Sequence, residues 1–347
     1  MIQSIQTSRG MAAVAVAVYH VYLIFLQKFG TPTFEVVSQY GQLGVPYFFV
    51  LSGFIITHAH WKDLGNAKSI PTYFYRRFVR VYPVYWIFSI VFVIAALVGF
   101  GDAELDPRWS SIVENIALIH FTPDFTSPPL KVAWTLFYEI RFYLLFGIAI
   151  INPRIGAVLG ACWVLACLLL KPFNAFTTEL LSFWSFAFLF GILAALAYKR
   201  FSPKAWLVCG GLGLILCASI LLGDAMDLRS KRSWFIIPVS AGFALVVLSQ
   251  ALREKQTGSK TNRIGKLLGD ASYSLYLVHS AAISAAVIII SRLGLQNTLP
   301  HAVLFIPVLI GAIIVGVLAH LVVEKPLMKA LRRPKRHDAA EVATAKA

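Results

Sequence analysis

Charged residues are scarce in this sequence. Asp, Glu, Lys and Arg together make up 14% of the 347 residues, whereas 58% are hydrophobic. Soluble globular domains carry roughly 25% charged residues, so this chain lacks the polar side chains needed to cover two or three soluble domains. Among the charged residues, the acidic ones are fewer than the basic ones, with 16 Asp and Glu against 31 Lys and Arg. The composition excludes a soluble multi-domain protein and indicates an integral membrane protein.

Cysteine is also rare, and its positions exclude two classes of site. The four cysteines all fall within long apolar runs. None has the spacing of a metal-binding motif, and none lies in an external loop where a disulfide would form. We therefore expect no metal site, and we interpret the cysteines as small apolar residues. They are Cys162, Cys167, Cys209 and Cys217.

The apolar residues gather into continuous runs of about 18 to 22 residues, which is the length of a helix that crosses a hydrocarbon core. The strict alternation of apolar and polar residues that is typical of a membrane β-barrel is absent. The spans are therefore expected to be helices, because a helix satisfies the hydrogen bonds of its own backbone in lipid. We predict an all-α bundle of about ten transmembrane helices. The expected spans are 10–27, 43–60, 83–100, 132–151, 155–171, 181–198, 205–222, 234–251, 268–290 and 303–323.

Positive charge is distributed unevenly along the chain. Most lysines and arginines lie before the first span, in every second loop and after the last span. Such an asymmetry places the basic side in the cytoplasm, so we expect both termini to be cytoplasmic. It also explains the net charge of +15 without nucleic-acid binding. Residues 1–330 are predicted to form the transmembrane domain, and residues 331–347 a basic, disordered cytoplasmic tail.

Ionisable residues inside the expected spans are candidates for function, because each is unfavourable in lipid unless it faces a partner or a cavity. Arg9 and His20 lie at the two ends of a run of ten nearly apolar residues. On a helix they share nearly the same face and are about 16.5 Å apart along the helix axis. In a structural interpretation, Arg9 reaches lipid phosphates and His20 bonds a carbonyl. In a functional one, Arg9 binds a cytosolic anion while His20 exchanges a proton deeper in the same channel.

Two further spans carry ionisable side chains. Glu139 and Arg141 are two residues apart and do not share a helical face, so each needs a partner on another helix. For Glu139 this partner is either an opposite charge or a histidine that it orients. In LGDASYSLYLVHS, a helix cap and an aromatic belt account for the serines and for tyrosines such as Tyr273, but not for His279.

Six stretches, in this order, resemble the acyltransferase-3 family of membrane acyltransferases, which includes exopolysaccharide and O-antigen O-acetylases. Any one of them is a weak signal, but six in order over nearly the whole chain are specific. The first and third most resemble the exopolysaccharide-production subgroup. The stretches are IQTSRGMAAVAVAVYH, GQLGVPYFFVLSGFII, YFYRRFVRVYPVYWI, WTLFYEIRFYLLF, LGDASYSLYLVHS and VEKPLMKAL.

The resemblance implies roles for individual residues. The family's essential arginine and histidine correspond to Arg9 and His20, and we expect Glu139 to complete this catalytic group. Three positions depart from the family pattern: Ser8 replaces a leucine, Thr135 replaces a serine, and Pro46 replaces an aspartate. We assign no function to the loop position of Pro46. The residues expected to bind the acyl donor or the acceptor are Ser52, Arg76, Arg77, Arg80, Tyr273 and His279.

The resemblance predicts an O-acyltransferase of the bacterial inner membrane. It would transfer an acetyl or other short acyl group from cytosolic acyl-CoA to a hydroxyl of a surface or exported polysaccharide, or of its lipid-linked precursor. Acetyl-CoA would be a substrate, and no bound cofactor is expected. His20 would act as general base, with its tautomer or charge fixed by Glu139, while arginines bind the donor phosphates. The sequence leaves open the identity of the acceptor, the acyl group and the oligomeric state. It also leaves open whether the acyl group is transferred directly or through an acyl-enzyme intermediate.

A proton-coupled transporter or flippase of lipid-linked sugars is the alternative from another class. It would use the same buried His and Glu side chains beside a basic rim. However, the sequence lacks the inverted repeat and the paired interrupted helices that are typical of such transporters. A non-catalytic scaffold would leave Arg9, His20 and Glu139 without a function.

Overall fold

Helices account for nearly all of the part of the chain that the structure describes. The structure is a computed structural model, and it describes residues 2–98, 108–119, 128–170, 181–223, 235–258 and 262–331. Within these ranges there is no β-strand, which confirms the all-α prediction. The longer helices are α1 (Gln3–Phe29), α3 (Gly44–Ala59), α4 (Ile70–Leu97), α6 (Trp134–Ile151), α7 (Pro153–Leu170), α8 (Ser185–Arg200), α9 (Trp206–Gly223), α10 (Ile236–Thr257), α11 (Arg263–Arg292) and α12 (His301–Ala319), and the shorter ones are α2 (Glu35–Ser38), α5 (Trp109–Ala117) and α13 (Lys325–Ala330).

Each expected span overlaps one of the longer helices, but α4 begins at Ile70, well before the expected span 83–100. In the described ranges, eight helical segments are long and apolar enough to cross a membrane. The two expected spans outside this set are α8, with 16 residues, and α9, most of which lies in the shorter apolar segment Pro203–Ser219. The count of ten crossings and the cytoplasmic termini stay predictions. The domain boundary at residue 330 also stays a prediction, and the expected tail lies outside the described residues beyond Leu331.

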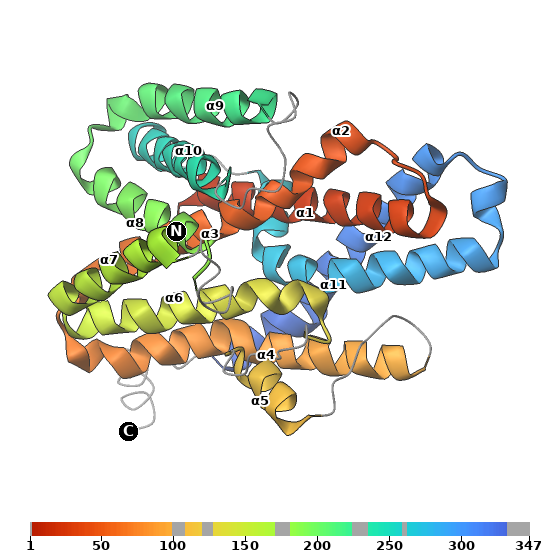
Figure 1. The fold of residues 1–347 in the computed structure, drawn as a ribbon, viewed down its shortest axis with the longest axis horizontal. Helices are drawn as coiled ribbons and strands as arrows, with labels where there is room; N and C mark the ends of the chain where they lie inside the picture. The colour runs from red at the N-terminus through yellow and green to blue at the C-terminus, as the bar shows by residue number, and fades with distance from the viewer. Residues whose placement is uncertain are drawn as a thin grey trace, which may run out of the picture.

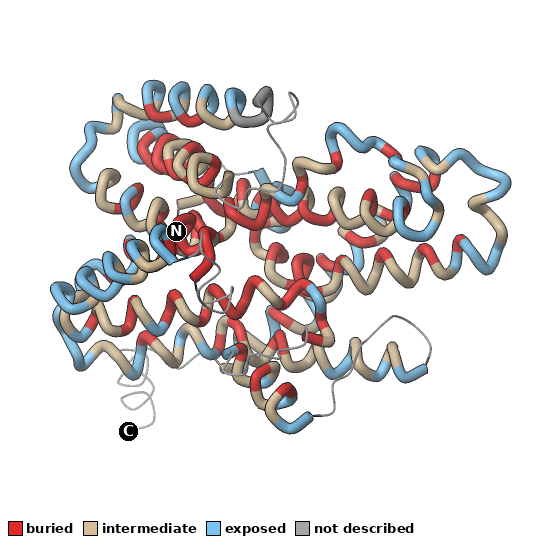
Figure 2. The backbone as a smooth tube through the Cα atoms, in the orientation of Figure 1, coloured by how far each residue is buried: buried red, intermediate tan, exposed pale blue. Residues whose placement is uncertain are grey.

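The helices are arranged in layers around α1, α3 and α11 (Figure 1). Helices α9 and α10 pack together along one edge of the molecule, and α4 and α6 lie towards the opposite edge. Figure 2 shows that buried residues concentrate on the central helices, whereas α7 and α9 are largely exposed. The exposed side chains of α7 and α9 include large apolar residues such as Val158 and Leu214. Such apolar outer surfaces are what a lipid-facing helix requires.

The central pair, α1 and α11, runs parallel and in close contact. A Cβ atom on Gly10 of α1 would lie 2.8 Å from the backbone nitrogen of Gly269 in α11, so only glycine permits this approach. Ten residues further along each helix, His20 meets His279 with the same sequence separation of 259 residues. The constant separation shows that both helices point the same way. This is the direction expected for the first and ninth of ten successive spans.

A second close contact fixes α3 against α8. A Cβ atom on Gly53 would lie 2.2 Å from the carbonyl oxygen of Phe188, and one on Gly191 would lie 2.1 Å from that of Val50. The two backbones approach each other because neither glycine has a side chain. Gly53 therefore has a packing role, and it holds the preceding Ser52 in place.

Helix α1 begins on a partner supplied by α10. The Glu254 carboxylate accepts hydrogen bonds from the backbone N–H groups of Gln3 at 2.8 Å and Ser4 at 2.7 Å. These donors at the start of a helix have no partner within it, and a negative charge there also complements the helix dipole. The first turn of the helix that carries Arg9 and His20 is thus anchored to α10.

Candidate active site

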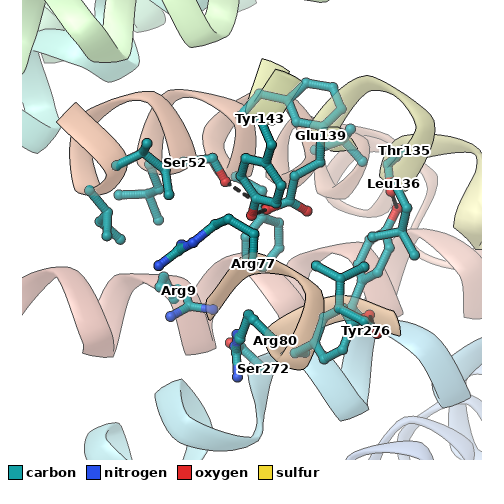
Figure 3. Close-up of a pocket in the computed structure, with 18 residues that line it drawn as sticks. Arg9, Ser52, Arg77, Arg80, Thr135, Leu136, Glu139, Tyr143, Ser272 and Tyr276 are labelled. Carbon is teal, nitrogen blue, oxygen red and sulfur yellow. Dashed lines mark hydrogen bonds between the residues drawn. The ribbon is translucent and has the colours of Figure 1, made fainter. Parts of the chain in front are cut away.

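A cavity of about 120 Å³ lies between α1, α3, α4, α6 and α11 (Figure 3). At ~30 Å³ per water molecule, it has room for about four waters. Its charged lining consists of Arg9, Arg77, Arg80 and Glu139. These residues come from three different helices, so the cavity brings together ionisable side chains that are far apart in the sequence. Its hydroxyl groups come from Ser52, Thr135, Tyr143, Ser272, Tyr273 and Tyr276.

Glu139 is held in the cavity by two hydroxyl groups. Ser52 Oγ on α3 donates a hydrogen bond to Glu139 Oε1 at 3.2 Å, and the Tyr143 hydroxyl, one turn along α6, donates to the same oxygen. Both bonds are drawn in Figure 3. The expected partner on another helix is therefore Ser52, rather than His20 or an arginine. Tyr143 could have been found from the sequence, because residues four apart share a helical face.

Arg80 is neutralised by a glutamate that the sequence analysis did not place in the site. Its Nη1 lies 2.6 Å from Glu324 Oε1, and the Glu324 side chain is 1% exposed. The other carboxylate oxygen of Glu324 is 2.7 Å from Ser274 Oγ and 2.8 Å from His320 Nδ1. His320 and Glu324 are the ends of a π-helical turn after α12, a feature often found at functional sites. The sequence signal for this residue was a glutamate that follows a histidine by four residues at the end of the last expected span.

Arg9 and Arg77 are less fully paired than Arg80. The buried Nε atom of Arg77 has no hydrogen-bond partner in the described ranges, and its guanidinium group lies 5.7 Å from the centre of the Tyr143 ring. Arg9 donates one long hydrogen bond, 3.4 Å, to Gln6. With Arg80 compensated by Glu324, these two guanidinium groups are available to an anion. Guanidinium groups bind phosphates and carboxylates through paired hydrogen bonds.

The remaining residues expected to bind substrate occupy different positions. Tyr273 lines the cavity, donates a hydrogen bond to the Val81 carbonyl at 2.8 Å, and lies beside the guanidinium of Arg80, 5.2 Å from its ring centre. Arg76 is exposed and is not among the cavity-lining residues. His279 is fully buried outside the cavity lining. The structure therefore does not bring Arg76 or His279 into the cavity.

His20 and His279 form a pair deeper along α1 and α11. Their ring centres are 4.7 Å apart, and His279 Nε2 lies 3.2 Å from His20 Nδ1. Tyr276 connects the two regions, because it lines the cavity and its ring centre is 5.8 Å from that of His279. Its hydroxyl is 2.9 Å from that of Thr135. The structure brings His20 together with His279 and does not bring it together with Glu139.

Metal binding has no candidate centre among the residues described. Within those ranges, no cluster of three or more His, Cys, Asp or Glu side chains could hold a metal ion.

Comparison with known proteins identifies the family. The Acyltransferase domain family matches residues 2–321. The exopolysaccharide production protein ExoZ of Rhizobium meliloti (strain 1021) is 29% identical over 301 residues, which cover 83% of this chain and 90% of ExoZ. The acyltransferase MdmB of Streptomyces mycarofaciens is 26% identical, with 94% of this chain and 92% of MdmB covered. The O-acetyltransferase OatA of Staphylococcus aureus (strain NCTC 8325 / PS 47) is 22% identical over 92% of this chain and 56% of OatA.

No solved structure matches the chain. The family match covers nearly the whole sequence, and the relatives that it resembles are named as acyltransferases or as an exopolysaccharide production protein. The protein therefore belongs to the acyltransferase-3 family and is an acyltransferase with several apolar helices of membrane-spanning length.

Proposed function

We propose that the protein transfers an acetyl or other short acyl group from acyl-CoA to a hydroxyl of a surface or exported polysaccharide, or of its lipid-linked precursor, in the bacterial inner membrane. One observation carries the proposal. Helix α1 lines a cavity with three arginines, and it also carries His20, whose Nε2 makes no hydrogen bond within the described residues. The relatives ExoZ and OatA are named for exopolysaccharide production and O-acetyl transfer, and these names support this class of reaction.

Charge supports an anionic donor. Three cavity arginines stand against Glu139 and Glu324, which leaves a formal excess of one positive charge at the site. The cavity can hold a phosphoryl or acyl group but not a whole coenzyme A molecule. The nucleotide end of the donor would therefore lie at the end of the bundle near Arg9, with the thioester extended along α1 towards His20. This arrangement requires the Arg9 end to face the cytoplasm, as the charge distribution predicts.

His20 has the properties of a general base. Its Nδ1 faces the Val16 carbonyl at 2.9 Å, and within the described residues its Nε2 makes no hydrogen bond. Nε2 would accept the proton of the attacking hydroxyl while that oxygen bonds to the thioester carbonyl carbon. The carbon–sulfur bond then breaks, and His20 returns the proton to the departing thiolate. The products are an ester and free coenzyme A, so the reaction balances without a further reactant.

Membership of an acyltransferase family favours this enzyme over the transporter alternative. In an enzyme the buried histidine and carboxylate serve a reaction, whereas in a transporter they would move a proton across the membrane. The two functions are separated by the fate of the acyl group, because a transporter leaves both substrates unmodified.

Acetyl transfer by the purified protein tests the proposal. The protein in liposomes is incubated with [¹⁴C]acetyl-CoA and with lipid-linked or exported polysaccharide from the source bacterium. We expect label in carbohydrate that mild alkali removes, as an O-ester requires, and no such label with His20→Ala. Absence of labelled carbohydrate with acetyl-, propionyl- and succinyl-CoA alike would contradict the proposal.

A further inference from the structure

We propose that His279 is a positioning residue that holds His20 in the Nδ1–H tautomer and so leaves Nε2 of His20 open to act as base. The catalytic meaning of this inference rests on the proposed function. Its structural part concerns the protons on two imidazole rings, and it can be tested separately.

The hydrogen-bond partners define the tautomer of each ring. His279 Nδ1 lies 3.1 Å from the Leu275 carbonyl, and His20 Nδ1 lies 2.9 Å from the Val16 carbonyl. A carbonyl oxygen only accepts hydrogen bonds, so each neutral ring carries its proton on Nδ1. The unprotonated Nε2 of His279 then faces His20 Nδ1 at 3.2 Å as a second acceptor for the same N–H group. The His20 N–H is thus shared between Val16 and His279.

The opposite arrangement would place acceptors against acceptors. If His279 Nε2 carried the proton and donated it to His20, both Nδ1 atoms would be unprotonated. Each would then face a carbonyl oxygen, at 2.9 Å in His20 and 3.1 Å in His279, with no hydrogen between them. Buried polar atoms without a hydrogen bond are unfavourable. His279 is fully buried, which makes this cost larger and favours the Nδ1–H form of both rings.

His279 therefore takes the place that a carboxylate occupies in many catalytic sites. In those sites an acidic side chain holds the base in one tautomer and stabilises the charged ring. Glu139 does not do this here, because its hydrogen bonds go to Ser52 and Tyr143. When His20 accepts a proton, its Nδ1–H group keeps two acceptors, the Val16 carbonyl and His279 Nε2. A neutral imidazole in this position orients the base without adding a second buried charge.

The tautomer can be read directly by ¹⁵N NMR of the full-length protein with ring-labelled histidine. The chain has eight histidines, so the His20 signals are assigned as those that disappear in His20→Ala. Protonated and unprotonated ring nitrogens resonate far apart. We expect Nδ1 of His20 to be protonated and Nε2 unprotonated in the wild type, and a mixture of the two forms in His279→Leu. A wild-type ring protonated on Nε2, or an unchanged single form in His279→Leu, would overturn the proposal.

Two isosteric variants keep the test valid if His279→Leu does not fold. In His279→Gln the amide lies near the position of Nε2 and can still accept from His20, whereas in His279→Asn it lies near Nδ1 and reaches only the Leu275 carbonyl. We expect kcat to fall roughly 10- to 100-fold in His279→Asn and His279→Leu but less than about 5-fold in His279→Gln, with KM for acetyl-CoA unchanged. Equal losses in His279→Gln and His279→Asn would overturn the positioning role.

His301→Leu is the matched control for the loss of a histidine next to α1. His301 contacts Thr31 at 3.0 Å and stacks on Phe29, remote from the cavity lining. We expect its kcat to equal that of the wild type. If no variant and no wild-type protein transfers an acyl group, the proposed function fails, and the NMR result still decides the role of His279.

Discussion

Helices α1 and α11 border two regions that differ in their chemistry. At the level of Arg9 and Ser272 they line a polar cavity, to which α3, α4 and α6 also contribute. Deeper along the same helices, His20 and His279 contact each other beside an apolar cluster that includes Val21 and Ile283. Glu139 and Arg80 in the cavity have partners on other elements, Ser52 and Glu324. Each imidazole faces a carbonyl of its own helix as well as the other imidazole. Under the proposed function, anion binding and proton transfer would therefore take place at different levels along α1.

The largest effect is expected from the deeper region. His20→Ala removes the proposed general base, so acyl transfer should fall roughly 10²- to 10⁴-fold. The thermal unfolding temperature should stay near that of the wild type, because His20 is only partly buried and its ring has one side-chain partner. Radiolabel transfer and a thermal melt measure the two quantities. Wild-type turnover in this variant would contradict the proposal that the region around His20 carries out proton transfer.

The next largest effect is expected on stability, at Glu324. Glu324→Gln removes the negative charge that faces Arg80 and leaves that guanidinium group without a counter-charge, which should lower the free energy of unfolding by about 3 kcal/mol. Chemical denaturation measures this change. Glu254→Gln is the control, since Glu254 caps the start of α1 at a less buried position and its change should cost about 1 kcal/mol. Equal losses in both variants would show that the Arg80–Glu324 pair is no more important than a helix cap.

A smaller effect on binding is expected from Arg9→Lys. A lysine keeps the charge but cannot form paired hydrogen bonds to a phosphate group. KM for acetyl-CoA should rise roughly 10-fold, with kcat within about 2-fold of the wild type. Steady-state kinetics at varied donor concentration measure both constants. A collapse of kcat with unchanged KM would move Arg9 from donor binding to the chemical step.

The smallest effect is expected at Arg76, and it sharpens the definition of the cavity. Arg76 is exposed and outside the cavity lining, whereas its neighbour Arg77 lines it. Arg76→Ala should change KM for acetyl-CoA by less than about 2-fold, and Arg77→Ala should raise it roughly 10-fold or more. The same kinetic assay compares the two. Similar effects in both variants would mean that the donor binds to surface charge rather than in the cavity.

Much of the fold could be predicted from the sequence, because membrane helices are encoded locally. Each expected span overlaps a helix, since length and apolar composition determine whether a segment can cross a bilayer. Charge inside a span also pointed to one charged residue of the cavity, Glu139, because a charged side chain there needs a cavity or a partner. Arg9, Arg77 and Arg80 lie outside the expected spans, and their place in the site was expected from the family resemblance.

The partners of these residues could not be predicted in the same way. Spacing shows which side chains share a helical face but not which helix that face meets. His20 meets His279 because α1 and α11 approach closely at Gly10 and Gly269, a contact between segments 259 residues apart. The pairing of Arg80 with Glu324 likewise depends on how the end of α12 packs against α4. For this reason the sequence did not show that Glu139, which was expected to support His20, makes its hydrogen bonds to Ser52 and Tyr143 instead.

Equilibrium binding of acetyl-CoA to catalytically impaired variants tests the central claim, the separation of anion binding from proton transfer, most directly. Isothermal titration calorimetry would compare wild-type protein, His20→Ala and Arg77→Ala under the same conditions. We predict that His20→Ala binds acetyl-CoA with the Kd of the wild type although its acyl transfer is roughly 10²- to 10⁴-fold slower. Arg77→Ala should have a Kd at least roughly 10-fold higher. Loss of binding in His20→Ala together with wild-type affinity in Arg77→Ala would contradict the account.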